Sequence, residues 1–203
     1  MSIDEGYIKY KSDWTIGPPV DAGIAAELNT WRQALYEAGL IGHYADLGIG
    51  FGNLSVRAAN RRQFYISGTQ TGHLARTDGR HYALVSAYDI DANSVHCEGP
   101  VQASSESLTH AAIYELDDSI GAIVHVHDKH LWKLLMSKLP ATDAEIAYGT
   151  PEMAREFRRL FDETEFSKLG LAVMAGHDEG LVSIGDTLEQ ASLRMLDLHR
   201  EFS

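Results

Sequence analysis

Six consecutive residues, Ala122-Ile123-Val124-His125-Val126-His127, decide how the rest of the sequence is interpreted. Their β-branched side chains predict a strand, which we place at residues 120–127. Side chains two positions apart on a strand project from one face, so the Cβ atoms of His125 and His127 should lie within about 7 Å. Two such imidazoles can share one metal ion, and half-buried histidines bonded to the backbone are the alternative for an isolated pair.

Two further residues in the sequence could complete a metal site with this histidine pair. His177 stands in a loop between two predicted strands, with Gly176 and Gly180 close on either side. Glu106 stands at the start of a predicted helix, where a carboxylate alone could merely complement the helix dipole. Three neutral imidazoles leave Zn²⁺ its double charge and an open position, which is typical of catalytic rather than structural sites. From the residues alone, His177 supports a metal site with the histidine pair, whereas for Glu106 taken by itself the helix-dipole interpretation is preferred.

Hydrophobic periodicity and glycine or proline breakers divide the rest of the chain into helices and strands. The expected helices span residues 21–40, 105–116, 129–137, 151–161 and 187–200. Asp128 is expected to cap the helix that follows it. Asp186 and Glu189 are expected to form a capping box for the last helix.

The expected strands are short and are separated in several places by tight turns. They span residues 53–57, 64–67, 94–97, 120–127, 171–175 and 181–184. Residues 82–90 are expected to be mixed, the glycine-rich residues 42–52 to form a loop, and residues 1–20 to form an arm on the domain. Tight turns between strands favour antiparallel pairing, so we expect one α/β domain over residues 1–203 with a largely antiparallel sheet.

The composition limits the partners and the location of the protein. A net charge of −12 disfavours nucleic acid and anionic membranes, because their phosphates repel such a field. No apolar run reaches the roughly 20 residues of a membrane span, and Met1–Glu5 does not begin a signal peptide. The single cysteine, Cys97, excludes an internal disulfide. We therefore expect a cytoplasmic protein that binds a small molecule, and no nucleic acid or membrane partner.

A glycine-rich loop and a pair of serines before a helix could hold an anionic substrate. Gly48, Gly50 and Gly52 resemble half of a dinucleotide-binding fingerprint, but a strand rather than a helix follows them. Their backbone N–H groups could instead form an anion nest, or the glycines could simply permit a positive φ. Ser104 and Ser105 precede a predicted helix, where they could act as caps, bind a phosphate, or do both.

Five short motifs resemble the class II aldolase/adducin family over most of the chain. They are Gly52-Asn53-Leu54-Ser55-Val56-Arg57, Ala103-Ser104-Ser105-Glu106 with His110 one turn later, Ala122-Ile123-Val124-His125-Val126-His127, Tyr148-Gly149-Thr150-Pro151-Glu152-Met153-Ala154, and Gly176-His177 leading to Gly180-Leu181 and Gly185. Each motif is short, but their order and spacing together are specific.

The resemblance implies a fold, a metal site and a substrate site. The family fold is a three-layer α/β/α arrangement with a central, mostly antiparallel sheet, and its members are commonly homotetramers. The residues that match the family's metal ligands are His125, His127 and His177, with Zn²⁺ usual and Mn²⁺, Fe²⁺ or Co²⁺ as alternatives. Glu106 matches the catalytic glutamate, which can also ligate the metal. The residues that match the phosphate-binding region are Asn53, Ser67, Thr71, Gly72, Ser104 and Ser105.

By this resemblance the chain is expected to be a metal-dependent lyase of the aldolase type. Its substrate would be a small phosphorylated hydroxy-ketone or sugar phosphate, whose enediolate the metal stabilises while Glu106 moves the proton. Epimerisation, dehydration or decarboxylation would use the same arrangement equally well. A non-catalytic, adducin-like assembly module is the alternative of another class, and retention of the three histidines and the glutamate argues against it.

The sequence departs from the family pattern in three places. Residues 42–51 lengthen one segment, and Asp178 and Glu179 follow His177 where the characterised sugar-phosphate aldolases have glycine. Those aldolases also use tyrosines after the histidine-bearing strand for proton transfer, whereas only Tyr148 follows it here. Candidates for a replacement acid are Tyr44, His43, His73 and Glu179. The sequence does not choose among them.

Overall fold

Strand β8 (Ala122–His127) lies inside the main sheet of the protein and is buried along its whole length. The computed structural model describes residues 7–202, and within them the main sheet has eight strands in the order β1-β7-β6-β5-β4-β8-β10-β9. β8 pairs antiparallel with β4 (Asn53–Arg57) on one side and with β10 (Gly180–Gly185) on the other. The strand expected at residues 120–127 is confirmed, with its first pairing residue at Ala122.

The other strands extend this sheet on both sides. They are β1 (Lys11–Ile16), β5 (Phe64–Ser67), β6 (Tyr82–Asp89), β7 (Ser94–Gly99) and β9 (Leu171–Val173). Every neighbouring pair is antiparallel except β1 with β7, so the mostly antiparallel sheet is confirmed. The segment expected to be mixed is a continuous strand, β6, which carries a register irregularity between Val85 and Ala87.

Two segments expected to be irregular contribute strands instead. Residues 11–16 of the expected arm form the edge strand β1, and the indole N–H of Trp14 donates to the carbonyl of Gly99 at 2.9 Å. The glycine-rich segment forms a separate hairpin of β2 (Gly42–Tyr44) and β3 (Ile49–Phe51). Backbone pairing provides both strands, and local composition carries little sign of it. Residues 1–6 of the expected arm lie outside the described residues.

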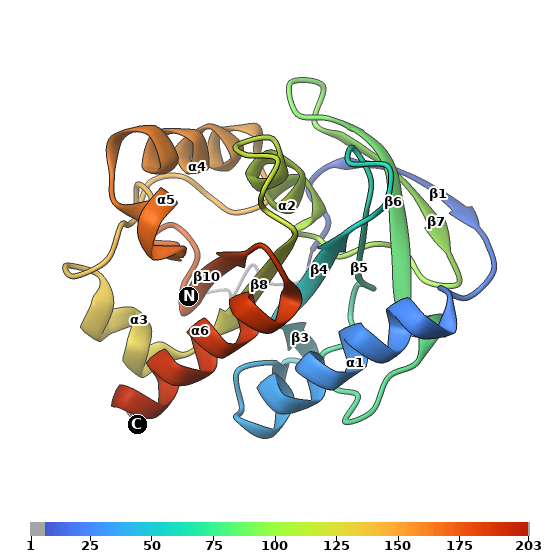
Figure 1. Ribbon diagram of the computed structural model, residues 1–203, viewed down its shortest axis with the longest axis horizontal. Coiled ribbons are helices and arrows are strands. Elements are labelled where there is room, and N and C mark those ends of the chain that lie inside the picture. The colour runs from blue at the N-terminus through green and yellow to red at the C-terminus, as the bar shows by residue number, and fades with distance from the viewer. Residues whose placement is uncertain (1–6, 203) are drawn as a thin grey trace.

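Helices cover both faces of the sheet (Figure 1). One layer contains α1 (Ala22–Glu37), α3 (Lys129–Leu135) and α6 (Leu188–Phe202). The opposite layer contains α2 (Ser107–Tyr114), α4 (Pro151–Glu163) and the short α5 (Phe166–Leu169). A 3₁₀ turn, η1 (Gly79–His81), precedes β6. Among the described residues, no helix is long and apolar enough to span a membrane.

Each helical layer encloses its own hydrophobic core against the sheet. Val124 packs with the core of α1, α3 and α6, whereas its neighbour Ile123 packs with the core of α2, α4 and α5. This alternation is the period-two pattern of a strand buried on both faces. The expected three-layer α/β/α fold is therefore confirmed.

The ends of two helices test the predicted caps. Asp128 accepts hydrogen bonds from the backbone N–H groups of His130 and Leu131, as predicted. At α6 the predicted box is wrong by one residue, because the helix begins at Leu188. The hydroxyl of Thr187 accepts from the N–H of Gln190 at 3.2 Å, and the Gln190 side chain accepts from the N–H of Asp186 at 2.8 Å. The hydroxyl next to the first helical residue reaches the free N–H groups best.

Candidate metal centre

Three buried histidines meet on the face of the sheet that carries α2 and α4. His125 and His127 come from β8, and His177 comes from the loop between β9 and β10. One ring nitrogen of each histidine lies within 4.8 Å of those of the other two. The Nε2 atoms of His125 and His127 are 3.1 Å apart. The structure therefore brings together the three histidines that the sequence analysis selected.

Glycines make room for the loop that carries His177. A side chain at Gly176 would place its Cβ 1.8 Å from the carbonyl oxygen of Ile146. A Cβ at Gly180 would lie 3.1 Å from the ring of His125 and 3.3 Å from that of His177. The ring of Tyr148 stacks on the His177 ring with centroids 4.3 Å apart. Close packing on all sides thus fixes the direction of the His177 ring.

Glu106 lies directly before α2 and faces two of these histidines. Its Oε2 is 3.1 Å from His125 Nε2, and its Oε1 is 3.2 Å from His177 Nδ1. Within residues 7–202, neither carboxylate oxygen accepts a hydrogen bond of ordinary geometry, although the side chain is only 2% exposed. A buried carboxylate whose oxygens accept no ordinary hydrogen bond is well placed to bind a cation.

Two side chains of the cluster, Glu106 and His127, are held in the protonation state that binds a metal. Burial alone would raise the pKa of Glu106, but nearby His125 and His177 outweigh that effect and lower the pKa to about 2. Burial, with repulsion from His177 and His125, holds the pKa of His127 well below its ordinary value. The cluster therefore offers an ionised carboxylate and an imidazole in its neutral, ligating form. This donor set fits a divalent metal ion, with the three histidines and Glu106 as the residues that would hold it.

A small hollow beside the histidines contains most of the residues predicted to bind phosphate. Asn53 is the register partner of His125 across the β4–β8 pair, so the hollow and the metal centre adjoin. The predicted residues that line the hollow are Asn53, Thr71, Gly72, Ser104 and Ser105. Within the described chain, the buried Oδ1 of Asn53 has no hydrogen-bond partner. Ser67 is not one of the lining residues: its carbonyl accepts from the N–H of Ser104 at 3.0 Å, and its hydroxyl accepts from the backbone N–H of Leu54 at 3.3 Å.

A buried arginine that the sequence analysis does not single out supports this hollow. Arg32 of α1 is 2% exposed, and its guanidinium donates to the carbonyl of Thr71 at 2.9 Å. A second, longer contact reaches the carbonyl of Gly72 at 3.5 Å. The signal in the sequence was the spacing of Leu28, Arg32 and Leu35, which places the arginine on the buried face of an amphipathic helix.

The candidates for a replacement acid occupy different environments. The hydroxyl of Tyr44 donates to Glu179 Oε2 at 2.8 Å and lies 3.0 Å from His127 Nδ1. His43 and His73 are exposed neighbours with ring centroids 6.2 Å apart. Tyr44 therefore contacts one of the candidate metal ligands directly, and Glu179 is connected to that ligand through Tyr44.

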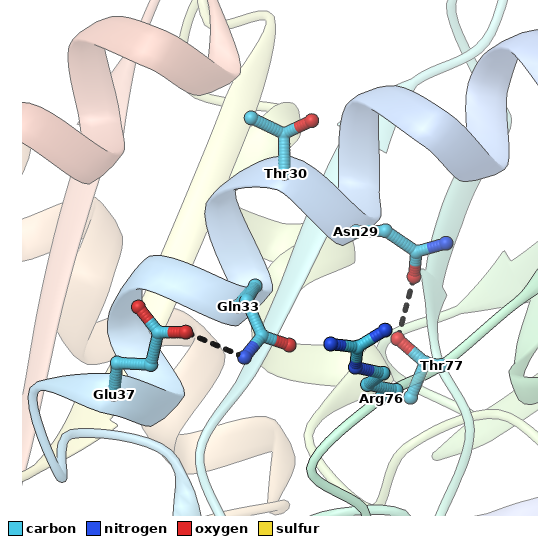
Figure 2. Close-up of a pocket in the computed structure, with 6 residues that line it drawn as sticks. All are labelled: Asn29, Thr30, Gln33, Glu37, Arg76 and Thr77. Carbon is cyan, nitrogen blue, oxygen red and sulfur yellow. Dashed lines mark hydrogen bonds between the residues drawn. The ribbon is translucent and has the colours of Figure 1, made fainter.

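A second, open hollow lies between α1 and the segment of Arg76 and Thr77 (Figure 2). It is lined by Asn29, Thr30, Gln33, Glu37, Arg76 and Thr77. Several of these side chains bond one another: Thr77 donates to Asn29 at 2.5 Å, and Gln33 donates to Glu37 at 2.8 Å. This hollow contains no histidine, and its polar groups are largely satisfied, so we assign it no role.

The fold and the site define a three-layer α/β protein with a buried arrangement of three histidines and a glutamate that could hold a divalent metal ion. The family described as Class II Aldolase and Adducin N-terminal domain matches residues 33–202, and the chain belongs to this family. The resemblance noted in the sequence is thereby confirmed.

The proteins similar to this chain carry the names of more than one kind of enzyme. A methylthioribulose-1-phosphate dehydratase from Hahella chejuensis is 27% identical over 86 residues, a match covering 41% of this chain and 40% of that protein. The match spans well under two thirds of that relative. A solved L-fuculose 1-phosphate aldolase has a TM-score of 0.66 and 19% identity, covering 91% of this chain and 86% of that one. The L-fuculose-1-phosphate aldolase of Thermus thermophilus has a TM-score of 0.65 and 21% identity, with coverages of 89% and 91%. At this identity the two structures show the fold alone.

Proposed function

We propose that this protein is a metal-dependent lyase of the aldolase type that acts on a small phosphorylated hydroxy-ketone or sugar phosphate. The observation that carries the proposal is the position of Glu106. It lies within 3.2 Å of two of the three converging histidines and follows directly after Ser104 and Ser105, which line the small hollow beside the histidines. A divalent ion held by this cluster supplies Lewis-acid stabilisation of negative charge on the substrate oxygens.

Glu106 is the base in this proposal. The lowered pKa of Glu106 keeps its carboxylate ionised at neutral pH, which is the form that can accept a proton from a substrate carbon or hydroxyl. Its place directly before α2 fixes the backbone, and burial excludes bulk water from the side chain. Proton transfer between a fixed carboxylate and a held substrate is the step that this residue performs.

The small hollow beside the histidines binds the phosphate group in this proposal. Ser104 and Ser105 stand just before α2, where free backbone N–H groups and the positive end of the helix dipole attract anions. Asn53, with its buried and unpaired amide oxygen, stands between this hollow and the metal centre. A substrate with its phosphate in the hollow would place the neighbouring carbons at Glu106.

Dehydration is the second candidate reaction, and the dehydratase relative favours it. In dehydration Glu106 would take the proton from the carbon next to the carbonyl, and in aldol cleavage it would take the proton of the hydroxyl whose neighbouring carbon–carbon bond breaks, so it is the base in both. The reactions differ in which bond breaks next. Cleavage divides the carbon skeleton, whereas dehydration keeps all the carbons and loses one water.

The ion, the assembly and the location complete the proposal. Zn²⁺ suits three imidazoles and a carboxylate, with Mn²⁺, Fe²⁺ and Co²⁺ as alternatives. We further propose a single domain over residues 1–203, a homotetramer of the 22.4 kDa chain and a cytoplasmic location. Light scattering after gel filtration measures the assembly directly.

The test is a product screen with protein loaded separately with each of the four ions. Sugar phosphates and related hydroxy-ketone phosphates are incubated with the protein, and the products are analysed by mass spectrometry. We expect a pair of shorter products from one substrate, or a single product lighter by one water if the dehydratase alternative holds. We expect Glu106→Gln to keep its metal and to lose about 100-fold or more in turnover.

Two outcomes would contradict parts of this proposal. Unchanged turnover in Glu106→Gln removes this residue as the base. Full metal loading with no product from any substrate favours the non-catalytic assembly module. His130→Gln, which alters an exposed histidine at the start of α3, serves as the matched control and should behave as wild type.

A further inference from the structure

The hairpin of β2 and β3 packs directly against the candidate metal centre. The Phe51 ring of β3 stacks on the His127 ring with centroids 5.4 Å apart and an angle of 24° between the planes. The Tyr44 ring, at the end of β2, packs on Phe51 at 4.7 Å. The hairpin thus covers one side of His127 with aromatic surface.

Tyr44 also connects His127 to a carboxylate. Its hydroxyl is 3.0 Å from His127 Nδ1 and donates to Glu179 Oε2 at 2.8 Å. A hydroxyl has a single proton to donate, so once it donates to Glu179 its oxygen accepts from the protonated Nδ1 of His127. The hydrogen bonds then run in one direction, from the imidazole through the tyrosine to the carboxylate.

This direction suits a metal ligand. His127 Nε2 lies 3.1 Å from His125 Nε2, so Nε2 faces the cluster while Nδ1 faces the hairpin. A histidine that binds a metal through Nε2 carries its proton on Nδ1 and donates it to an outer partner, which holds the ring in place. His125 has a comparable outer contact, from its Nδ1 to the carbonyl of Leu181 at 3.1 Å.

Glu179, at the end of this chain of hydrogen bonds, is fixed by its own backbone conformation and by a neighbouring lysine. Glu179 has a φ of +70°, a backbone conformation that is unfavourable for residues other than glycine. Lys129 Nζ lies 3.3 Å from its other carboxylate oxygen, and the Glu179 side chain is 21% exposed. A strained backbone and two side-chain contacts place one carboxylate oxygen at Tyr44.

We propose that Tyr44 and Glu179 are positioning residues for His127, which keep the proton on Nδ1 and aim Nε2 at the bound divalent ion. The inference rests on the metal site of the proposed function. Tyr44 and Glu179 lie in two of the segments that depart from the family pattern, residues 42–51 and 178–179. They meet at a single metal ligand.

The test measures affinity for Zn²⁺ by competition with a chromophoric chelator, and the visible absorption of the Co²⁺-loaded protein. Tyr44→Phe keeps the ring on Phe51 and removes only the hydroxyl. We expect its affinity for Zn²⁺ to fall about 10- to 100-fold and its Co²⁺ spectrum to change, with the midpoint of thermal unfolding of the metal-free protein unchanged. Glu179→Gln should weaken binding less, and the double variant should be no weaker than Tyr44→Phe, because both changes break one chain of hydrogen bonds.

The control is Tyr65→Phe, which removes a hydroxyl on β5 in the core with α1, α3 and α6 and should leave both readouts at wild type. Wild-type affinity and an unchanged Co²⁺ spectrum in Tyr44→Phe would overturn the positioning role and leave the metal site standing. A wild-type protein that binds neither Zn²⁺ nor Co²⁺ would overturn both the metal site and this inference.

Discussion

His110 shows how burial decides the protonation of a single side chain. It stands one helical turn after Glu106, is 1% exposed, and places its Nδ1 2.8 Å from the hydroxyl of Ser55. The Ser55 hydroxyl in turn lies 2.8 Å from that of Tyr114. Burial lowers the pKa of His110 to about 3, so the imidazole is neutral at pH 7. His110 belongs to a buried polar network behind Glu106 rather than to the metal cluster.

This lowered pKa predicts a stability that depends on pH. Between pH 6.5 and about 3 the unfolded chain binds a proton at His110 and the native chain does not, so stability is lost as the pH falls. Urea unfolding of the metal-free protein at pH 7.5 and pH 5.5 measures the effect. We expect the wild type to lose about 1 kcal/mol more between these pH values than His110→Asn, whose side chain does not titrate.

A matched variant isolates this effect from those of other histidines. His130 is exposed on α3, and His130→Asn should show the pH dependence of the wild type. Equal losses in His110→Asn and wild type would show that His110 titrates normally in the native protein, against the lowered pKa.

At the scale of elements, α1 and the loop that follows β5 hold one another through a buried cation. Arg32 crosses from the helix to the carbonyl of Thr71, which also accepts from the N–H of Leu74 at 3.1 Å. Burial lowers the pKa of Arg32 from its ordinary value. The turn beginning at Thr71 therefore depends on a side chain that lies 39 positions earlier in the sequence.

Removing this guanidinium should loosen the loop. In Arg32→Met we expect the amide of Leu74 to exchange with deuterium about tenfold faster, equivalent to about 1.4 kcal/mol of lost local stability, because a charged donor has left the Thr71 carbonyl. Hydrogen exchange with mass spectrometry measures it. Gln33→Met is the control on the same helix, because Gln33 bonds Glu37 rather than the loop. Equal exchange in both variants would show that Arg32 does not order the turn.

At the scale of the whole molecule, the candidate metal centre joins segments that the chain brings together from far apart. The residues that would ligate an ion come from β8, from the start of α2 and from the loop between β9 and β10. An unfolded chain does not hold these residues in one place, so an ion bound there stabilises the native state.

Removal of the ion should therefore lower the midpoint of thermal unfolding. At a free-ion concentration about 100 times the dissociation constant, binding stabilises by about 2.7 kcal/mol. For a chain of 203 residues this corresponds to a shift of about 5–10 °C on adding a chelator. The double variant His125→Ala/His127→Ala should show no chelator effect. If the chelator leaves the midpoint of thermal unfolding of the wild-type protein unchanged, that result would contradict the metal site.

Much of the fold and part of the site could be predicted because the signals are local. The β-branched residues among 122–127 identify a strand, and its geometry puts His125 and His127 on one face, since side-chain direction repeats every two residues. Asp128 predicts the start of α3 because a cap acts on backbone groups two and three residues away. Once the family motifs were recognised, Glu106 and His177 joined the pair without any knowledge of distances.

Only the tertiary structure decided which distant segments touch. β1 and the hairpin of β2 and β3 exist through backbone pairing, so composition predicted an arm and a loop in their place. Local sequence patterns also do not predict the hydrogen bond from Arg32 to Thr71. The same holds for the hydrogen bonds that connect Tyr44 to His127 and Glu179. The sequence by itself determined which side chains could ligate a metal, because strand geometry and motif order are properties of short stretches. The surroundings of those ligands were set by long-range packing, which no short stretch encodes.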